Sequence, residues 1–218
     1  MIEIEAKIRH PGAVLDLGRI IHENLVVPRR YILGTEPLVF TMEDRYLYDS
    51  KGATVRFRKE HFASLVTDLS SLKYLITIKE KTVVDGVEIN KEDEREISEE
   101  ETTRRIEEYS HQGFEDLRYT KTKTGMCYRF TNDITINAEA VFVIRNTEIY
   151  SVGRYFEVER ILPDNSSQEQ IQDARKHVLE TLEALGLDTT QIESRSWKAL
   201  CEEALSNEKA TYHKQGSD

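Results

Sequence analysis

The stretch MIEIEAK, residues 1–7, alternates polar and apolar side chains almost from its first residue. Glu3, Glu5 and Lys7 occupy every second position, with isoleucine or alanine at the positions between them. In a β-strand successive side chains point to opposite faces, so these three charges would share one face, roughly 6.5–7 Å apart along the strand. Because like charges on one face repel each other, this stretch alone favours a strand whose charged face is solvated.

The composition is that of a single globular domain. The chain has 218 residues, of which 39% are hydrophobic and 32% are charged, and a chain of this length can bury a substantial core. Its 30 Lys and Arg residues against 40 Asp and Glu residues give a formal net charge of −10. General nucleic-acid binding and anionic-membrane binding need a basic surface, so we expect no membrane partner and disfavour a nucleic acid. A local basic site remains compatible with this balance.

Cysteine usage and the N-terminal sequence predict a cytoplasmic protein. Cys127 and Cys201 lack the spacing of a metal-binding or redox pair, so both are expected to be reduced thiols. The first residues lack the basic and apolar regions of a signal peptide, and no segment approaches the length of a continuous apolar span.

Periodicity divides the chain into many strands and few helices. Alternation predicts strands over 1–9, 37–49, 53–60, 74–84, 87–97, 114–123, 126–137, 139–149 and 153–162. Helical spacing and the capping pairs Ser98/Glu101 and Ser166/Glu169 predict helices over 12–27, 98–111, 166–185 and 194–205. Residues 61–73 are expected to form a loop with a short helix. Such an order favours one domain over 1–206, with a largely antiparallel sheet that curls or closes, and a polar tail over 207–218.

Six of the predicted strands carry a like-charged pair two residues apart. Solvated sheet faces usually mix signs, because like charges side by side destabilise a sheet. If the strands close into a barrel, these faces would line the lumen, where charges must be paired or must hold a ligand. Clustered glutamates suit a hard divalent cation, and clustered lysines and arginines suit a polyanion, so together they describe a site for a metal-bound polyphosphate. The pairs are Glu3/Glu5, Arg56/Arg58, Lys79/Lys81, Glu94/Glu96, Lys121/Lys123 and Glu157/Glu159.

Short motifs along residues 1–200 resemble, in order, the signatures of one known family. This family is the CYTH superfamily, the triphosphate tunnel metalloenzymes. A single five-residue match is weak, whereas an ordered series over most of the chain is specific. The motifs are EIEAK (3–7, resembling E-x-E-x-K), DRYLYD (44–49, D-x-Y-Y-D), VRFR (55–58, L-R-I-R), TIKEK (77–81, T-x-K-x-K), ERE (94–96, R-x-E-x-E), KTK (121–123, K-x-R), VGRYFEVE (152–159, L-G-x-F-x-E-x-E) and RSWKAL (195–200, K-S-Y-x-E-L).

The resemblance implies an α+β fold: a closed eight-stranded antiparallel β-barrel, or tunnel, with a charged lumen and helices packed outside. It also implies that the lumen binds a small-molecule triphosphate with one or two Mg²⁺ or Mn²⁺ ions. Glu94 and Glu96 are weaker candidates for a second metal site. Carried over by motif, the metal ligands are Glu3, Glu5, Glu157 and Glu159. The substrate-binding residues are Lys7, Arg56, Arg58, Lys79, Lys81, Lys121, Lys123 and Arg195, and the catalytic residues are Glu5, Lys81 and Glu159.

The sequence departs from the family pattern at three places. Many members place an aspartate six residues before the motif glycine, where this chain has Thr147, with Glu148 beside it. Lys123 replaces an arginine, which keeps the charge but loses the bidentate fork. The polar stretch 61–73 is an insertion relative to compact members.

Family activities include hydrolysis of inorganic triphosphate, thiamine triphosphate or the RNA 5′ end, and cyclisation of ATP to cyclic AMP. We expect a divalent-metal-dependent triphosphatase, with a class IV adenylyl cyclase as the alternative. A non-catalytic polyphosphate or nucleotide sensor is disfavoured, because anion binding alone would not need two E-x-E pairs. The sequence does not choose among the small triphosphates, and it leaves a homodimer open. Trp197 is expected to pack a helix against the core.

Overall fold

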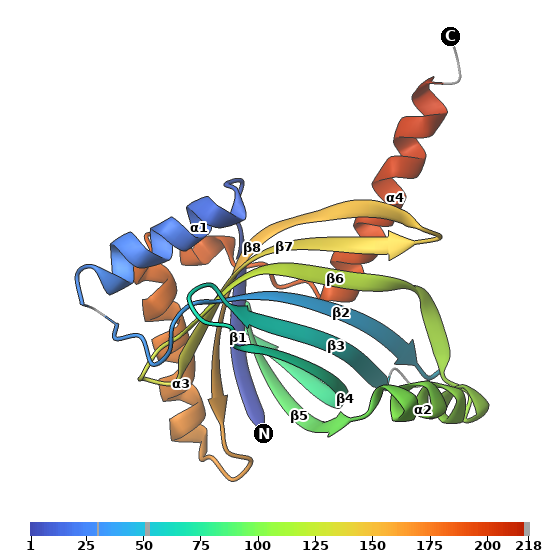
Figure 1. Ribbon diagram of the computed structural model, residues 1–218, viewed down its shortest axis with the longest axis horizontal. Coiled ribbons are helices and arrows are strands. Elements are labelled where there is room, and N and C mark those ends of the chain that lie inside the picture. The colour runs from blue at the N-terminus through green and yellow to red at the C-terminus, as the bar shows by residue number, and fades with distance from the viewer. Residues whose placement is uncertain (30, 51–52, 216–218) are drawn as a thin grey trace.

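The architecture is a closed antiparallel barrel of eight strands, in a computed structural model that describes residues 1–29, 31–50 and 53–215, with side chains to Asn207 (Figure 1). The strands follow one another around the barrel in the order β1-β5-β4-β3-β2-β6-β7-β8. The barrel expected from the sequence is thereby confirmed. The strands are β1 (Ile2–Arg9), β2 (Leu38–Tyr48), β3 (Thr54–Ser64), β4 (Ser70–Val84), β5 (Val87–Ile97), β6 (Glu115–Arg129), β7 (Ile134–Arg145) and β8 (Glu148–Leu162).

Helices cover the outside of the barrel, as expected. The helices α1 (Val14–Ile21), continued by a π-helical turn over His22–Val26, and α3 (Gln168–Ala184) lie together on one side (Figure 1). Their apolar faces bury the outward side chains of β1, β7 and β8, among them Ile4, Ile136 and Val158, and this is the largest core cluster. On another side, α2 (Glu99–His111) packs against Leu47 and Phe57 of β2 and β3. Because apolar residues occupy the outward faces, the charged faces must turn inward.

The capping prediction holds for one helix and is shifted by one residue for the other. Ser98 accepts a hydrogen bond from the backbone N–H of Glu101 at 3.0 Å and begins α2 as predicted. The capping box of α3 uses Ser167 and Gln170 rather than Ser166 and Glu169. Either serine satisfies the sequence pattern, so only the extended backbone of Ser167 decides which one caps.

The polar stretch 61–73 is not a loop with a short helix: it is the end of a long β-hairpin. β3 and β4 stay paired out to Ala63 opposite Ser70, and the Ser64 N–H donates to the Leu69 carbonyl at 2.9 Å. The regular alternation of a half-buried strand is missing here because much of the hairpin is exposed. Backbone pairing, which the side-chain pattern does not report, keeps the strands together.

Residues 114–162 form three strands, not the four predicted. The expected break at 124–125 lies inside β6, where a Cβ on Gly125 would come within 2.1 Å of the Ala138 carbonyl oxygen. Gly125 therefore permits a close approach of β6 to β7 rather than a turn. The β6–β7 turn holds Asp133 and the β7–β8 turn holds Asn146 and Thr147, all with positive φ. Asn and Asp adopt this backbone readily, whereas Thr does so rarely.

The helix α4 (Trp197–Gln215) begins at one end of the barrel and points away from it (Figure 1). Its first turns pack Leu200 and Cys201 against Val141, Val143 and Tyr155. The predicted domain end at 206 falls within this helix, and the last residues of the predicted tail, 216–218, lie outside the described residues. Among the helices of the described part of the chain, none is long and apolar enough to cross a membrane.

Candidate active site inside the barrel

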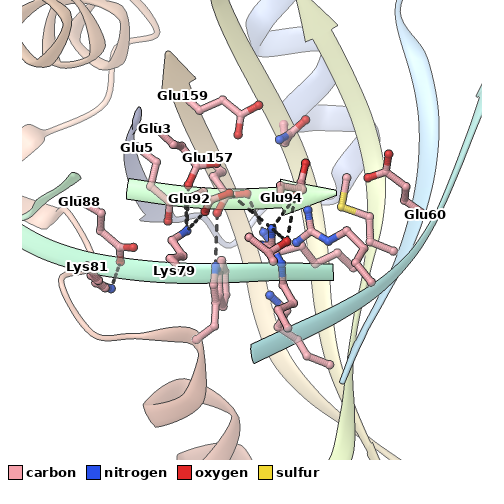
Figure 2. Close-up of a pocket in the computed structure, with 18 of the residues that line it drawn as sticks. Glu3, Glu5, Glu60, Lys79, Lys81, Glu88, Glu92, Glu94, Glu157 and Glu159 are labelled. Atoms are coloured by element: carbon pink, nitrogen blue, oxygen red, sulfur yellow. Dashed lines mark hydrogen bonds and ion pairs between the residues drawn. The ribbon is translucent and has the colours of Figure 1, made fainter. Parts of the chain in front are cut away.

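A cavity of about 410 Å³ lies inside the barrel, and all eight strands contribute side chains to its wall (Figure 2). Eight carboxylates and eight cationic side chains of the described residues line it, so its wall is close to neutral. A bound triphosphate would add several negative charges to this wall, and a buried charge must be compensated. The lining carboxylates are Glu3, Glu5, Glu60, Glu88, Glu92, Glu94, Glu157 and Glu159, and the cations are Arg56, Arg58, Lys79, Lys81, Lys121, Lys123, Arg129 and Lys198.

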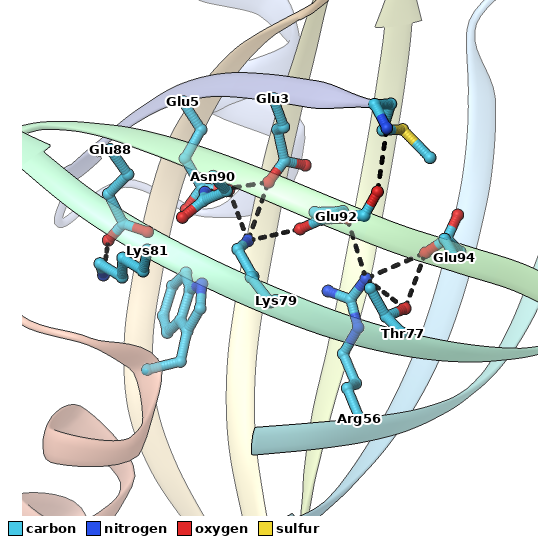
Figure 3. Close-up of polar contacts among 12 residues, drawn as sticks. Glu3, Glu5, Arg56, Thr77, Lys79, Lys81, Glu88, Asn90, Glu92 and Glu94 are labelled. Carbon is cyan, nitrogen blue, oxygen red and sulfur yellow. Dashed lines mark hydrogen bonds and ion pairs between the residues drawn. The ribbon is translucent and has the colours of Figure 1, made fainter. Parts of the chain in front are cut away.

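Lys79 of β4 is the counter-ion of the glutamates on β1 and β5 (Figure 3). Its Nζ lies 2.8 Å from a carboxylate oxygen of Glu3, 2.8 Å from one of Glu92 and 3.8 Å from one of Glu5. Burial alone would lower the pKa of Lys79, but the three carboxylates outweigh it and hold the pKa well above its ordinary value. Lys79 is therefore fully charged, and its ammonium group is paired with carboxylates.

The pKa values of Glu157 and Glu159, both on β8, are shifted in opposite directions. Glu157 accepts a hydrogen bond from Lys123 at 2.6 Å, which lowers its pKa against the effect of burial. Glu159 lies opposite Glu5 in the β1–β8 register, and its carboxylate makes no hydrogen bond or ion pair with another described residue. Burial raises the pKa of Glu159 well above its ordinary value, and repulsion from Glu3, Glu157 and Glu5 adds to this rise. An added cation near Glu159 would relieve this repulsion.

The carboxylate oxygens at this end of the cavity are suitable ligands for a hard divalent cation, although they do not converge on one point. Carboxylate oxygens from β1 and β8 are the ligands that Mg²⁺ and Mn²⁺ prefer. Within the described part of the chain, however, no three carboxylate, histidine or cysteine side chains already converge as a ligand set. Lys79 lies among the carboxylates instead, so a metal ion would have to compete with its ammonium group.

Asp44 of β2 joins two of the predicted phosphate-binding cations. Arg58 donates to both of its oxygens, at 2.7 and 3.0 Å, and Lys121 Nζ lies 2.8 Å away. Asp44 is fully buried, and burial would raise its pKa, but these two cations hold the pKa well below its ordinary value. Arg56 of β3 donates to a single carboxylate oxygen of Glu94 on β5, at 3.1 Å (Figure 3).

Trp197, the first residue of α4, lies close to three of the lysines and lines the cavity. The ammonium groups of Lys7, Lys121 and Lys123 lie 5.3, 5.1 and 4.5 Å from the centre of its indole ring. The indole N–H donates to Glu157 at 3.3 Å. Trp197 therefore packs against the core, as expected, and also forms part of the cavity wall.

The structure brings most of the predicted site residues together. Lys7 is buried beside the cavity and, like Lys81, forms an ion pair with Glu88. Arg195 does not line the cavity: its guanidinium pairs with Glu193 at 2.7 Å and Glu203 at 2.9 Å, so its role as a phosphate contact gains no support from this geometry. Those that line the cavity are Glu3, Glu5, Arg56, Arg58, Lys79, Lys81, Lys121, Lys123, Glu157 and Glu159.

The two remaining acidic candidates lie away from the lumen. Glu96 has a side chain 59% exposed and pairs with Lys73 at 2.9 Å, because its end of β5 continues past the cavity. The pair Glu94/Glu96 is therefore not an inward doublet. Glu148 begins β8 on the surface, where it accepts a hydrogen bond from Tyr150.

Sequence reasoning missed five acidic residues in or beside the cavity. One is Glu60, which continues the inward alternation of Arg56 and Arg58 along β3. Glu88 and Glu92 lie on the same face of β5 as Glu94, so extending the alternation of that strand would have found them. Asp44 alternates with the cavity residue Tyr46, but a single acidic residue gives no doublet. Glu139, fully buried 3.0 Å from Lys123, is the one charged residue within the apolar stretch 134–144, and that isolation is its signal.

Solved structures share this barrel. The PH1819 protein of Pyrococcus horikoshii is 18% identical, with a TM-score of 0.64 over 95% of this chain and 99% of that one. The PH1012 protein of the same organism is 22% identical, with a TM-score of 0.60 over 91% and 99%. A candidate adenylate cyclase from Vibrio parahaemolyticus is 12% identical, with a TM-score of 0.60 over 92% and 97%. At these identities the likeness shows the fold alone, a closed antiparallel barrel.

No protein-family model matches the chain, and no curated protein matches its sequence.

Proposed function

We propose that this protein is a divalent-metal-dependent triphosphatase that hydrolyses a small triphosphate inside its barrel. The observation that carries the proposal is the arrangement of charge in the cavity. Carboxylates of β1 and β8 face a set of lysines and arginines from β3, β4 and β6, within one enclosed wall. An anion-binding site alone would not need the carboxylates, and a metal site alone would not need the cations.

The cations would hold the phosphates in the tunnel. Arg56 and Arg58 offer bidentate contacts, while Lys79, Lys81 and Lys123 act as point charges. Each of these side chains is now paired with a carboxylate, so the bound triphosphate would take over contacts that the protein makes to itself. The present ion pairs hold the cations in position before the substrate binds. Phosphoryl transfer requires such positioning.

Glu3, Glu5, Glu157 and Glu159 would hold the metal. A bound Mg²⁺ or Mn²⁺ supplies positive charge to the phosphates and orients water for in-line attack. Glu5 and Glu159 lie opposite each other on β1 and β8, so the two strands would share the ion. Lys81, which now pairs with Glu88, would stabilise charge that develops on the leaving oxygen.

A class IV adenylyl cyclase is the second candidate, because one of the structural neighbours is a candidate adenylate cyclase. The same cavity would then bind ATP and promote attack by the ribose hydroxyl. A product assay with Mg²⁺ or Mn²⁺ separates the two activities. We expect phosphate release from inorganic or organic triphosphates. Formation of pyrophosphate and cyclic AMP from ATP would instead identify the protein as the cyclase.

A further inference from the structure

An apolar patch interrupts the charged wall of the cavity where β2, β3 and β6 meet. Phe40 and Met42 of β2 and Cys127 of β6 form a buried cluster, against which Phe62 of β3 packs. Phe40 and Phe62 lie opposite each other in the β2–β3 register, with ring centres 5.7 Å apart. Met42, Phe62 and Cys127 also line the cavity, so a bound molecule can reach them.

This patch adjoins the phosphate-binding cations. Met42 lies directly opposite Lys123 in the β2–β6 register, and side chains so placed have Cβ atoms about 5 Å apart. Along β2, Met42 comes two residues before Asp44, on the same inward face, and Asp44 holds Arg58 and Lys121. A molecule whose phosphates contact these cations would therefore place its next atoms on the patch.

Two polar side chains border the patch and limit what it can bind. The Arg129 guanidinium lies 5.3 Å from the centre of the Phe62 ring, and a guanidinium so placed can also stack on a flat ligand. Glu60 lines the cavity beside Phe62, and its carboxylate makes no hydrogen bond or ion pair with another described residue. Figure 2 shows Glu60 on the other side of the view from Glu5 and Glu88. Its free carboxylate can accept hydrogen bonds from N–H groups.

From this geometry we infer that the patch is a subsite for a flat aromatic group with N–H donors, carried on the triphosphate. The physiological substrate is then an organic triphosphate rather than inorganic triphosphate, which has no apolar part to place there. This inference rests on the proposed triphosphatase activity. The aromatic group would stack on Phe62, contact Met42 and donate to Glu60, while its phosphates extend toward Lys123 and Arg58.

The test compares substrates across a matched pair of variants. Phe62→Ala removes the aromatic wall, and Leu72→Ala removes a similar apolar side chain from the adjacent, outward position of the same hairpin. Phe62→Leu keeps the apolar volume without the ring and guards against misfolding of the alanine variant. The measured quantity is kcat/KM for ATP, thiamine triphosphate and inorganic triphosphate in Mg²⁺ or Mn²⁺.

For the wild-type protein we expect a higher kcat/KM with at least one of the two organic triphosphates than with inorganic triphosphate. Phe62→Ala should lower that value roughly tenfold, as loss of a stacked ring usually does, and leave inorganic triphosphate within about twofold. Leu72→Ala should change neither substrate. A wild-type preference for inorganic triphosphate, or equal losses on both kinds of substrate in the Phe62 variants, overturns the subsite.

If no triphosphate is hydrolysed, the proposed function fails and binding decides the subsite. Trp197 is the single tryptophan of the chain and lines the cavity, so its fluorescence reports on occupancy directly. Titration should then show weaker binding of ATP or thiamine triphosphate to Phe62→Ala than to the wild type, with inorganic triphosphate unchanged. Equal affinities of the two proteins for every ligand would overturn the subsite independently of activity.

Discussion

Three lysine ammonium groups share one indole ring, and this makes Trp197 a positioning residue as well as a packing residue. Each cation–π contact contributes about 0.5–2 kcal/mol, depending on how far it is desolvated. The ring also holds the three ammonium groups at fixed places in or beside the cavity wall. Its N–H donates to Glu157, so the loss of Trp197 would leave both the lysines and this glutamate less firmly positioned.

We predict that Trp197→Leu weakens the binding of inorganic triphosphate about tenfold, because the lysines lose their common support. Trp197→Phe keeps the aromatic face and should lose less. Isothermal calorimetry with each variant measures the change, and thermal unfolding shows whether the fold is kept. Wild-type affinity in a folded Trp197→Leu protein would show that the ring only packs.

Glu139 gives a pH dependence whose direction follows from its surroundings. Burial raises the pKa of Glu139 above its ordinary value, and repulsion from Glu157 raises it further, against the attraction of Lys123. The folded protein then holds a proton that the unfolded chain releases, so stability is greatest below the unfolded carboxyl pKa. It falls as the pH rises through the folded pKa.

We therefore predict that Glu139→Gln unfolds at a higher temperature than the wild type at about pH 8, and at a similar temperature at about pH 4. Glutamine cannot ionise, so the variant escapes the loss of stability. Melting curves of both proteins across this range check the prediction, and parallel pH profiles would contradict it.

At the scale of the elements, Asp44 ties together three neighbouring strands, β3, β2 and β6, through Arg58 and Lys121. All three groups are nearly removed from water. Breaking a buried ion pair at one partner is costly because it leaves the other charge unpaired. The network therefore couples the phosphate-binding cations to the closure of the barrel.

Asp44→Asn should lower the free energy of unfolding by about 3 kcal/mol, since two buried cations lose their carboxylate. Asp93→Asn is the matched control on β5, because its pair with Arg95 is exposed and its loss should leave the free energy of unfolding nearly unchanged. Denaturant unfolding of both variants gives the two values. Equal effects of the two substitutions would show that the buried network does not stabilise the barrel.

The elements also show what the sequence predicts well and what it does not. Side-chain alternation identified the inward faces of β1, β3, β4, β6 and β8, because a charged doublet between apolar residues has one consistent arrangement in a barrel. It failed at 61–73, where hydrogen bonds to the neighbouring strand keep an exposed hairpin together. It also failed at Gly125, where glycine permits close strand packing instead of a turn.

For the site, the sequence predicts which residues face the lumen but not how they pair. The sequence predicts Lys79 as a phosphate contact but not its ion pairs with Glu3 and Glu92, because only the closed barrel brings β1, β5 and β4 side by side. Arg195 was assigned by motif alone and lies outside the cavity, because nearby Glu193 and Glu203 hold its guanidinium. Contacts between strands far apart in the sequence depend on which strands become neighbours when the barrel closes, and alternation within one strand does not report this.

At the scale of the whole molecule, the near-neutral wall of the cavity makes metal and triphosphate depend on each other. A triphosphate alone brings excess negative charge, and a metal alone must compete with Lys79. Each partner would remove the other's electrostatic cost, so their binding should be mutually favourable by linkage.

We predict that Mg²⁺ raises the affinity for a non-hydrolysable triphosphate analogue at least about tenfold over the affinity in a chelator. The analogue should raise the affinity for Mg²⁺ by the same factor, because coupling between two sites is reciprocal. Calorimetric titrations in both orders measure the two factors. Independent binding would contradict a shared site.

The most direct test of the account is phosphate release from a triphosphate by the wild-type protein and by Glu159→Gln, each with Mg²⁺ or Mn²⁺ and with a chelator. The Glu159 carboxylate has no hydrogen-bond or ion-pair partner among the described residues and is repelled by Glu3, Glu157 and Glu5, so glutamine should preserve the fold. The account predicts metal-dependent release by the wild type and none by a folded Glu159→Gln protein. Release without metal, or wild-type release by Glu159→Gln, would contradict it.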